Sequence, residues 1–353
     1  MDLSLFQKPQ INLARSTPWR MWLVSLAAMM AIFQSSLSDG FHSLIIALAA
    51  SAGALGTELL FNLRQRYYSI KDGSALASAL VLTLLLPNGI NPLCAFLGAV
   101  FAMAVLKHSF GGLGSNWINP AAGAWLFIRS AWPGAAGRGI QGSPLVNLAA
   151  SLEGGLRNSQ GPLALLKING WESAPLDRLL SSFLNGTVFR FTGAALPQGY
   201  LGLLAPPGPG IIADRGLLFL LGGTILLASF QCFRLWLPGV FLLCYSLLVR
   251  AFGALSFGGA PGEGDVLFAL LSGGTAAAAF MLITDPATGP KSVPGRGIFA
   301  ALSALFAFLF RYPGMDPYGA VSAVLVGNAL APLVRRIENG FYYEKRREPW
   351  AKP

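Results

Sequence analysis

The chain has 353 residues, of which 54% are hydrophobic and only 11% are charged. A soluble globular protein carries charge on roughly a quarter of its residues. This composition therefore leaves too little polar surface for a soluble protein and predicts an all-α integral membrane protein in contact with the lipid bilayer. The net charge of +10 does not indicate nucleic-acid binding, because the basic residues stand in short segments beside apolar runs.

Metal ligands are scarce in the sequence. Cys94, Cys232 and Cys244 fall in or beside apolar runs and form no C-x-x-C spacing, while His42 and His108 are far apart. Structural zinc and iron–sulfur clusters need about four grouped ligands. We therefore expect no metal site.

Apolar runs bounded by charged residues, Gly and Pro predict about ten membrane spans. The first is expected to be retained, because no small-residue cleavage site precedes it. Runs 73–86, 93–106 and 298–310 are shorter than the roughly 20 residues that a straight spanning helix needs. We expect these three to use flanking residues, or to be broken or re-entrant helices buried within protein. The predicted spans are 21–37, 41–62, 73–86, 93–106, 119–132, 216–232, 236–252, 265–283, 298–310 and 318–334.

The distribution of basic residues predicts the orientation. An N-terminus in the cytoplasm leaves 16 of the 25 Lys and Arg residues on the cytoplasmic side. This arrangement obeys the positive-inside rule. An even number of spans then returns the C-terminus to the same side, so both termini are predicted to be cytoplasmic.

A long polar segment divides the predicted spans into two groups of five. Because five is an odd number, the second group must enter the membrane from the opposite side, which is the condition for an inverted repeat. The predicted organisation is a first five-span repeat at 1–132, an extracytoplasmic loop at 133–215, a second five-span repeat at 216–336 and a cytoplasmic tail at 337–353.

Matching polar residues in the two groups support this repeat. Asp72 opens the third predicted span and Asp265 opens the eighth. The fifth span begins at Asn119-Pro120, and the tenth carries Asn328 four residues before a proline. Interrupted helices at corresponding positions form the site between the repeats in folds of this kind.

Three segments carry the candidate site residues. Segment 71–76 offers a carboxylate that either contributes to a site or caps a cytoplasmic helix start. Segment 111–120 contains glycines and asparagines that let a backbone approach a ligand closely, although an interfacial turn has the same composition. Segment 284–297 is a Pro- and Gly-rich loop that could surround a phosphate, a flavin ring or a partner. The candidates are Asp72, Gly112, Gly114, Asn116, Asn119, Thr284, Asp285 and Arg296.

These segments resemble the RnfD and NqrB family of flavin-bearing membrane subunits. The resemblance lies in K-D-G-S-A-L-x-x-x-L-x-L-x-L-P at 71–87, G-G-L-G-x-N-x-x-N-P-A at 111–121, and T-D-P with a following P-x-G-R at 284–297. The order and spacing match across both halves, and the length resembles RnfD more than the larger NqrB.

The resemblance implies a subunit of an Rnf-type ion-translocating oxidoreductase in a bacterial inner membrane. Such a subunit passes electrons through flavin in a process coupled to Na⁺ or H⁺ movement, and it works with other membrane and peripheral subunits rather than alone. Family members hold a non-covalent riboflavin in the membrane part. They also carry an FMN joined by a phosphoester to a Thr in an S-x-A-T segment of the external loop.

The external loop departs from this family pattern. The nearest match to the flavin segment is 192–197, where Ala195 stands in place of the flavin-bearing Thr. A methyl group cannot form a phosphoester, so covalent FMN is not expected at Ala195. Thr192, at the Ser position of the pattern, and Thr187 are alternative attachment residues.

Two other functions remain open from the sequence. One is a scaffold subunit that holds redox partners without carrying electrons, and the other is a channel or transporter for a small solute. Ionisable residues within the predicted spans are few, which argues against a standalone ion pump. Glu58 is the main exception, and it either contributes to a cation path or faces a neighbouring group.

Overall fold

The computed structural model describes residues 16–65, 70–138, 175–187, 190, 198–206 and 209–347. Within these ranges every regular element is helical, and an isolated bridge joins Pro87 to Ile211. Six of the described helices are long and apolar enough to cross a membrane. The prediction of an all-helical protein with the composition of an integral membrane protein is therefore confirmed.

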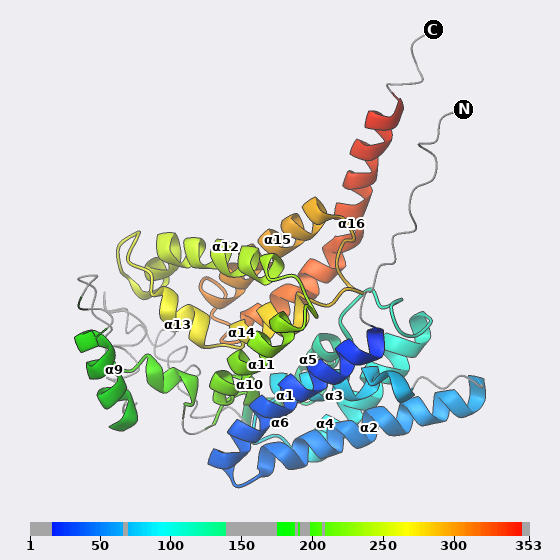
Figure 1. Ribbon diagram of the computed structural model, residues 1–353, viewed down its shortest axis with the longest axis horizontal. Coiled ribbons are helices and arrows are strands. Elements are labelled where there is room, and N and C mark those ends of the chain that lie inside the picture. Colours follow the sequence, from blue (N-terminus) through cyan, green and yellow to red (C-terminus); the bar gives the residue numbers. More distant parts are fainter. Residues whose placement is uncertain are drawn as a thin grey trace, which may run out of the picture.

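A helix occupies each of the ten ranges in which the sequence predicted a span. Figure 1 shows the helices of the first half, in blue and cyan, beside those of the second half, in light green to red. The first half contains α1 (Thr17–Asp39), α2 (His42–Gln65), α3 (Ser74–Leu85), α4 (Pro92–Phe101) and α5 (Pro120–Ala131). The second contains α11 (Leu217–Ser229), α12 (Trp236–Phe252), α13 (Val266–Leu271), α14 (Thr275–Ala277), α15 (Val293–Arg311) and α16 (Gly319–Arg347). Between them lie α6 (Pro133–Arg138), α9 (Pro175–Thr187) and α10 (Ile212–Arg215).

Two of the three ranges predicted to be short contain long helices. After α4, a π-helical stretch at Ala102–Lys107 and a 3₁₀ turn at His108–Phe110 extend the helix to 19 residues. In α15, the Ser292 hydroxyl accepts the backbone N–H of Gly295 at 3.0 Å, so this helix also has 19 residues. Only α3, with 12 residues, is as short as predicted.

The eighth predicted span is not one continuous helix. It breaks at Ser272–Gly274, where Gly273 and Gly274 have positive φ angles of 70° and 68°. The Asp214 carboxylate accepts both glycine N–H groups, at 2.9 and 2.8 Å, while Arg311 donates to the Ser272 carbonyl at 2.9 Å. The Asp214 carboxylate thus faces the N–H groups at the start of α14, and the Arg311 cation faces the carbonyl group at the end of α13, so each charge meets the opposite partial charge. The break is therefore held from both sides.

The two halves are joined by small residues of α1 and α11. A Cβ built on Gly223 would lie 2.8 Å from the Ala27 Cβ, and one built on Gly216 would lie 2.1 Å from the Ala31 carbonyl oxygen. Small residues allow helix backbones to approach closely in membranes. A second junction between the halves is formed by α5 and α16.

The halves also share an internal pattern. α2 packs on α4 as α12 packs on α15, and α3 packs on α5 as α14 packs on α16. Ser74 follows Gly73, which has a positive φ angle, and the Ser74 hydroxyl accepts a hydrogen bond from Lys107 at 2.8 Å. Thr275 follows Gly274, which also has a positive φ angle, and the Thr275 hydroxyl accepts a hydrogen bond from Arg311 at 3.0 Å. These pairs join equivalent helices of the two halves, as an internal repeat requires.

One predicted pairing of the halves differs in the structure. Asn119 caps α5, whereas Asn328 lies inside α16 rather than at its start. Asp316 lies shortly before α16, and its carboxylate accepts the Tyr318 N–H at 3.1 Å. Asn119 makes the same kind of contact before α5, with the N–H of Ala121. The counterpart of Asn119-Pro120 is therefore Asp316-Pro317.

Candidate functional site

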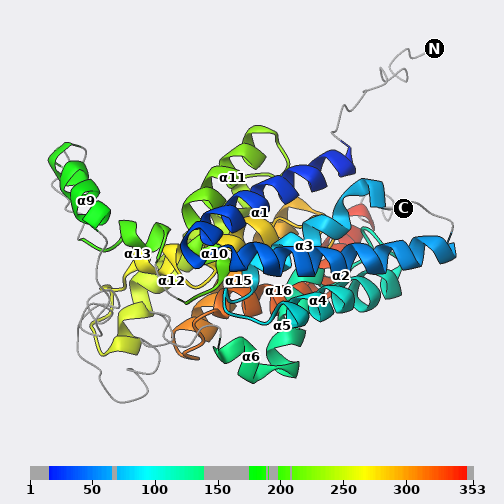
Figure 2. The ribbon, with the colours of Figure 1, turned by 90° about the horizontal axis from the view of Figure 1, so that it is seen from below.

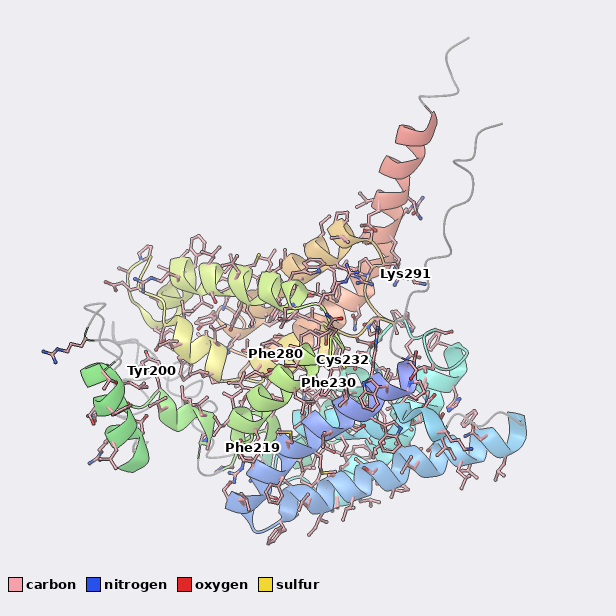
Figure 3. The ribbon with its side chains drawn as sticks, in the orientation of Figure 1. Tyr200, Phe219, Phe230, Cys232, Phe280 and Lys291 are labelled. Carbon is pink, nitrogen blue, oxygen red and sulfur yellow. The ribbon has the colours of Figure 1, made fainter. Side chains whose placement is uncertain are left out.

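A cavity of about 400 Å³ lies where the two halves meet. Its walls come from α1, α3, the loop before α5, α11, the π-helical stretch at Ala278–Leu282 and the loop that follows it. Figure 3 labels Cys232 and Phe280 of the second half at this boundary. A site between repeats, formed by interrupted helices, is where the sequence predicted a ligand.

Five of the predicted site residues line this cavity. Gly114, Asn116 and Asn119 come from the first half, and Thr284 and Asp285 come from the second. The Asn119 side chain accepts the first N–H groups of α5 and donates to the Asp285 carboxylate at 3.1 Å. A hydrogen bond between residues 166 positions apart thus ties two predicted segments into one site.

The other predicted residues do not line the cavity. Asp72 accepts from both the N–H and the hydroxyl of Ser74, at 2.8 and 2.6 Å, so it fixes the start of α3. Gly112 has a φ of +91° and faces open space, and Arg296 donates to the Pro290 carbonyl at 3.0 Å. Their predicted contact with a ligand stays a prediction, since the residues that line this cavity do not include them. Thr192 and Ala195 lie outside the described residues.

Sequence reasoning missed the cations of the cavity wall. Arg20, Lys107 and Lys291 all line it, and Asp285 is the single lining carboxylate among the described residues. Lysines at predicted helix ends were explained by membrane orientation alone, and that explanation hid their contact with the site. The wall that the described residues form therefore favours a ligand with electron-rich oxygen or nitrogen atoms.

Lys107 belongs to a buried polar network behind the cavity. Its ammonium donates to both Glu58 carboxylate oxygens, at 2.9 and 3.0 Å, and to Ser74. His108 Nε2 lies 2.8 Å from the same carboxylate, and its ring stacks on Phe61 with centroids 4.3 Å apart. Lys107 and Glu58 are 2% and 0% exposed. Of the two alternatives for Glu58, the structure shows it facing neighbouring groups.

Two polar groups of the cavity have unusual environments. Asn116 is only 7% exposed, and its Oδ1 atom has no hydrogen-bond partner among the described residues. A buried, unpaired acceptor costs about 1–3 kcal/mol, so a ligand that donates to it would be favoured. Burial raises the pKa of Asp285, although hydrogen bonds from Ala287 and Asn119 act in the opposite direction.

The remaining wall is apolar. Phe233 and Phe280 provide aromatic surface, and Val24, Val81 and Leu227 provide aliphatic surface. Sites for small molecules have volumes of roughly 300–1,000 Å³ and combine apolar walls with a few convergent polar groups. The cavity therefore has the size and chemistry for a small, partly polar ligand.

Comparison with known proteins identifies the family. The model of the NQR2, RnfD, RnfE family matches residues 4–342. The chain belongs to this family. It is 28% identical to a subunit of the proton-translocating ferredoxin:NAD(+) oxidoreductase complex of Clostridium ljungdahlii, over 98% of this chain and 97% of the relative. It is 30% identical to a subunit of the ion-translocating oxidoreductase complex of Escherichia fergusonii, over 95% of this chain and 96% of the relative. It is 26% identical to a subunit of the Na(+)-translocating ferredoxin:NAD(+) oxidoreductase complex of Acetobacterium woodii, over 95% of this chain and 93% of the relative.

Proposed function

We propose that this chain is the membrane subunit of an Rnf-type ion-translocating oxidoreductase complex and that it passes electrons through a non-covalent flavin in the cavity. The observation that carries the proposal is the cavity of about 400 Å³ between the halves. It is lined by residues of both family-like segments, 111–120 and 284–297. The names of the relatives support the class of complex.

The residues of the cavity fit a flavin such as riboflavin. The unpaired Asn116 Oδ1 atom can accept a hydrogen bond from a donor on the polar edge of the ring system. Phe280 and Phe233, whose ring centroids are 6.3 Å apart, would provide aromatic surface for the ring system, and the hydrogen bond of Asn119 to Asp285 joins two segments of the lining. When bound, a flavin supplies the electron-transfer chemistry, while the protein binds it, orients it and excludes water. The cations of Arg20 and Lys291, which also line the cavity, would favour added negative charge.

Covalent FMN is not part of this proposal. Ala195 lacks the hydroxyl that a phosphoester needs, and Thr192 fits the attachment pattern poorly. Fluorescence of the denatured protein in a gel tests this point. A dark band is expected, whereas a fluorescent band that Thr192→Ala abolishes would establish a covalent flavin at Thr192.

We further propose ten spans arranged as two inverted repeats, with both termini in the cytoplasm of a bacterial cell. The matched contacts of Ser74 with Lys107 and of Thr275 with Arg311 support the repeat. The excess of Lys and Arg on one side supports the orientation. Reporter fusions test it: a cytoplasmic reporter should be active at the C-terminus, and a periplasmic reporter should be active after Glu263, between α12 and α13.

Other subunits are expected to be necessary for activity. The relatives are named as subunits of complexes, and electron transfer through the cavity requires a donor and an acceptor that the described residues do not provide. We propose that this chain assembles with membrane and peripheral subunits of such a complex. Purification of the tagged chain should therefore recover these subunits in fixed ratio.

The flavin itself can be tested by extraction. The purified protein should release flavin on denaturation, and Asn116→Ala should weaken its binding about 3–10-fold, the effect of losing one or two net hydrogen bonds. Ser115→Ala is the matched control, because Ser115 is exposed on the same loop and does not line the cavity. Equal flavin loss in both variants would contradict the assignment of Asn116.

Absence of extractable flavin would refute the redox role and leave a scaffold subunit or a solute transporter. A flux assay on the isolated protein in liposomes separates these two. Solute uptake without any redox partner would support the transporter, and a silent, flavin-free protein would support the scaffold.

A further inference from the structure

Helix α9 has the reverse of the usual amphipathic arrangement. Its residues Leu179 and Phe183 are 66% and 62% exposed, whereas Asp177 and Ser181 are buried. Residues four apart share a face of a helix, so the apolar pair lies on the face opposite to the buried polar pair. A helix on a water-exposed surface directs its apolar face inward. α9 therefore suits surroundings that are not water.

The orientation of α9 is fixed by its polar face. The Asp177 carboxylate accepts the N–H groups of Gly199 and Gly202 in the following turn. Two hydrogen bonds then fix this turn to the helical body. The Tyr200 hydroxyl donates to Asp265 at 2.7 Å, and the Gln34 amide donates to the Leu204 carbonyl at 3.0 Å. These bonds prevent the helix from rolling to bury its apolar face.

Helix α9 lies at an end of the molecule where other apolar side chains are also exposed. Figures 1 and 2 both show α9 at the edge of the molecule, at the end where α1 turns into α2 and where α12 leads into α13. At this end, Leu37 in the last turn of α1, Phe41 between α1 and α2, and Leu255 after α12 are also exposed. This is the end of the molecule at which α1 ends, α2 begins and α12 ends.

We propose that α9 is an interfacial membrane helix. Leu179 and Phe183 insert among the lipid chains at the boundary of the headgroups, and Arg178, which is exposed beside them, directs its guanidinium to the lipid phosphates. A cation that flanks an apolar face is typical of helices that lie in the plane of the interface. This attachment would hold the loop that contains α9 against the outer surface of the membrane. It does not depend on the proposed flavin.

Spin labelling of the full chain in phospholipid nanodiscs tests the proposal. A nitroxide is attached to Phe183→Cys, and separately to Leu179→Cys, in a variant without the three native cysteines. Collision rates are measured with oxygen, which concentrates in lipid, and with a water-soluble nickel chelate. Glu263→Cys is the control, because Glu263 is an exposed polar residue in the turn between α12 and α13 at the same end.

At both α9 positions, the ratio of oxygen to nickel collisions should exceed that of the control several-fold, in the isolated chain and in the assembled complex. A ratio equal to the control would mean that this face contacts water, and the proposal would be wrong. Protection from both reagents in the complex but not in the isolated chain would mean that α9 binds a partner subunit. That result would also overturn the membrane assignment.

Discussion

Replacing Lys107 with methionine should strongly destabilise the protein. Methionine keeps the length of the side chain but leaves the Glu58 carboxylate without its ammonium partner. The two groups are 2.9 Å apart and are 2% and 0% exposed, so the loss of the cation leaves a charged carboxylate in a buried position. Breaking one partner of a buried ion pair costs about 3–5 kcal/mol. Because His108 still contacts Glu58, we expect a loss at the lower end of this range.

Unfolding in sodium dodecyl sulfate, followed by helix circular dichroism, measures this cost. The double variant Glu58→Gln/Lys107→Met should recover to within about 1 kcal/mol of the parent, since replacing a whole buried pair is often neutral. Arg129→Met is the control, because the pair of Arg129 with Asp316 is 44% and 19% exposed and should contribute about 1 kcal/mol or less. A loss for Lys107→Met no larger than the control, or no recovery in the double variant, would refute the reasoning.

Two further predictions concern helix packing and pH. Gly53→Ala should lower the free energy of unfolding by about 1–3 kcal/mol, because its Cβ would lie 2.5 Å from the Phe96 carbonyl oxygen. Gly56→Ala, on the same helix with no atom within 4 Å, should be neutral or stabilising by about 0.5–1 kcal/mol; equal effects in chemical unfolding would contradict this. Because burial raises the pKa of Asp285, the folded state binds more protons at this group than the unfolded state. Its contribution to stability should therefore decline as pH rises above the ordinary pKa of an aspartate, and Asp285→Asn should flatten the measured dependence of unfolding free energy on pH.

Part of the site was predictable because it consists of residue types with few other uses. Glycine, asparagine and proline at a predicted membrane boundary are conspicuous, and Asn116, Asn119 and Asp285 were found in this way. The cations were not, because a lysine at a helix end has an ordinary explanation. Only the three-dimensional arrangement distinguishes Lys107, which is buried against Glu58 and lines the cavity, from Arg296, which bonds a nearby carbonyl.

The sequence by itself determined the class of fold and the ranges in which the helices of the two halves lie. Hydrophobic runs reveal helices because each residue of a helix in lipid satisfies its backbone hydrogen bonds within the segment. Helix ends depend on finer contacts. The early start of α15 rests on the Ser292 cap, and the break at Gly273 and Gly274 is held by Asp214 and Arg311 from distant parts of the chain.

Tertiary structure decided the rest, since it brings together residues that the chain separates. The contact of Asn119 with Asp285 joins positions 166 apart, and no local pattern encodes that distance. The same is true of the outward apolar face of α9: its pattern predicts an amphipathic helix, but only the bonds of Asp177 to Gly199 and Gly202 determine which face turns inward.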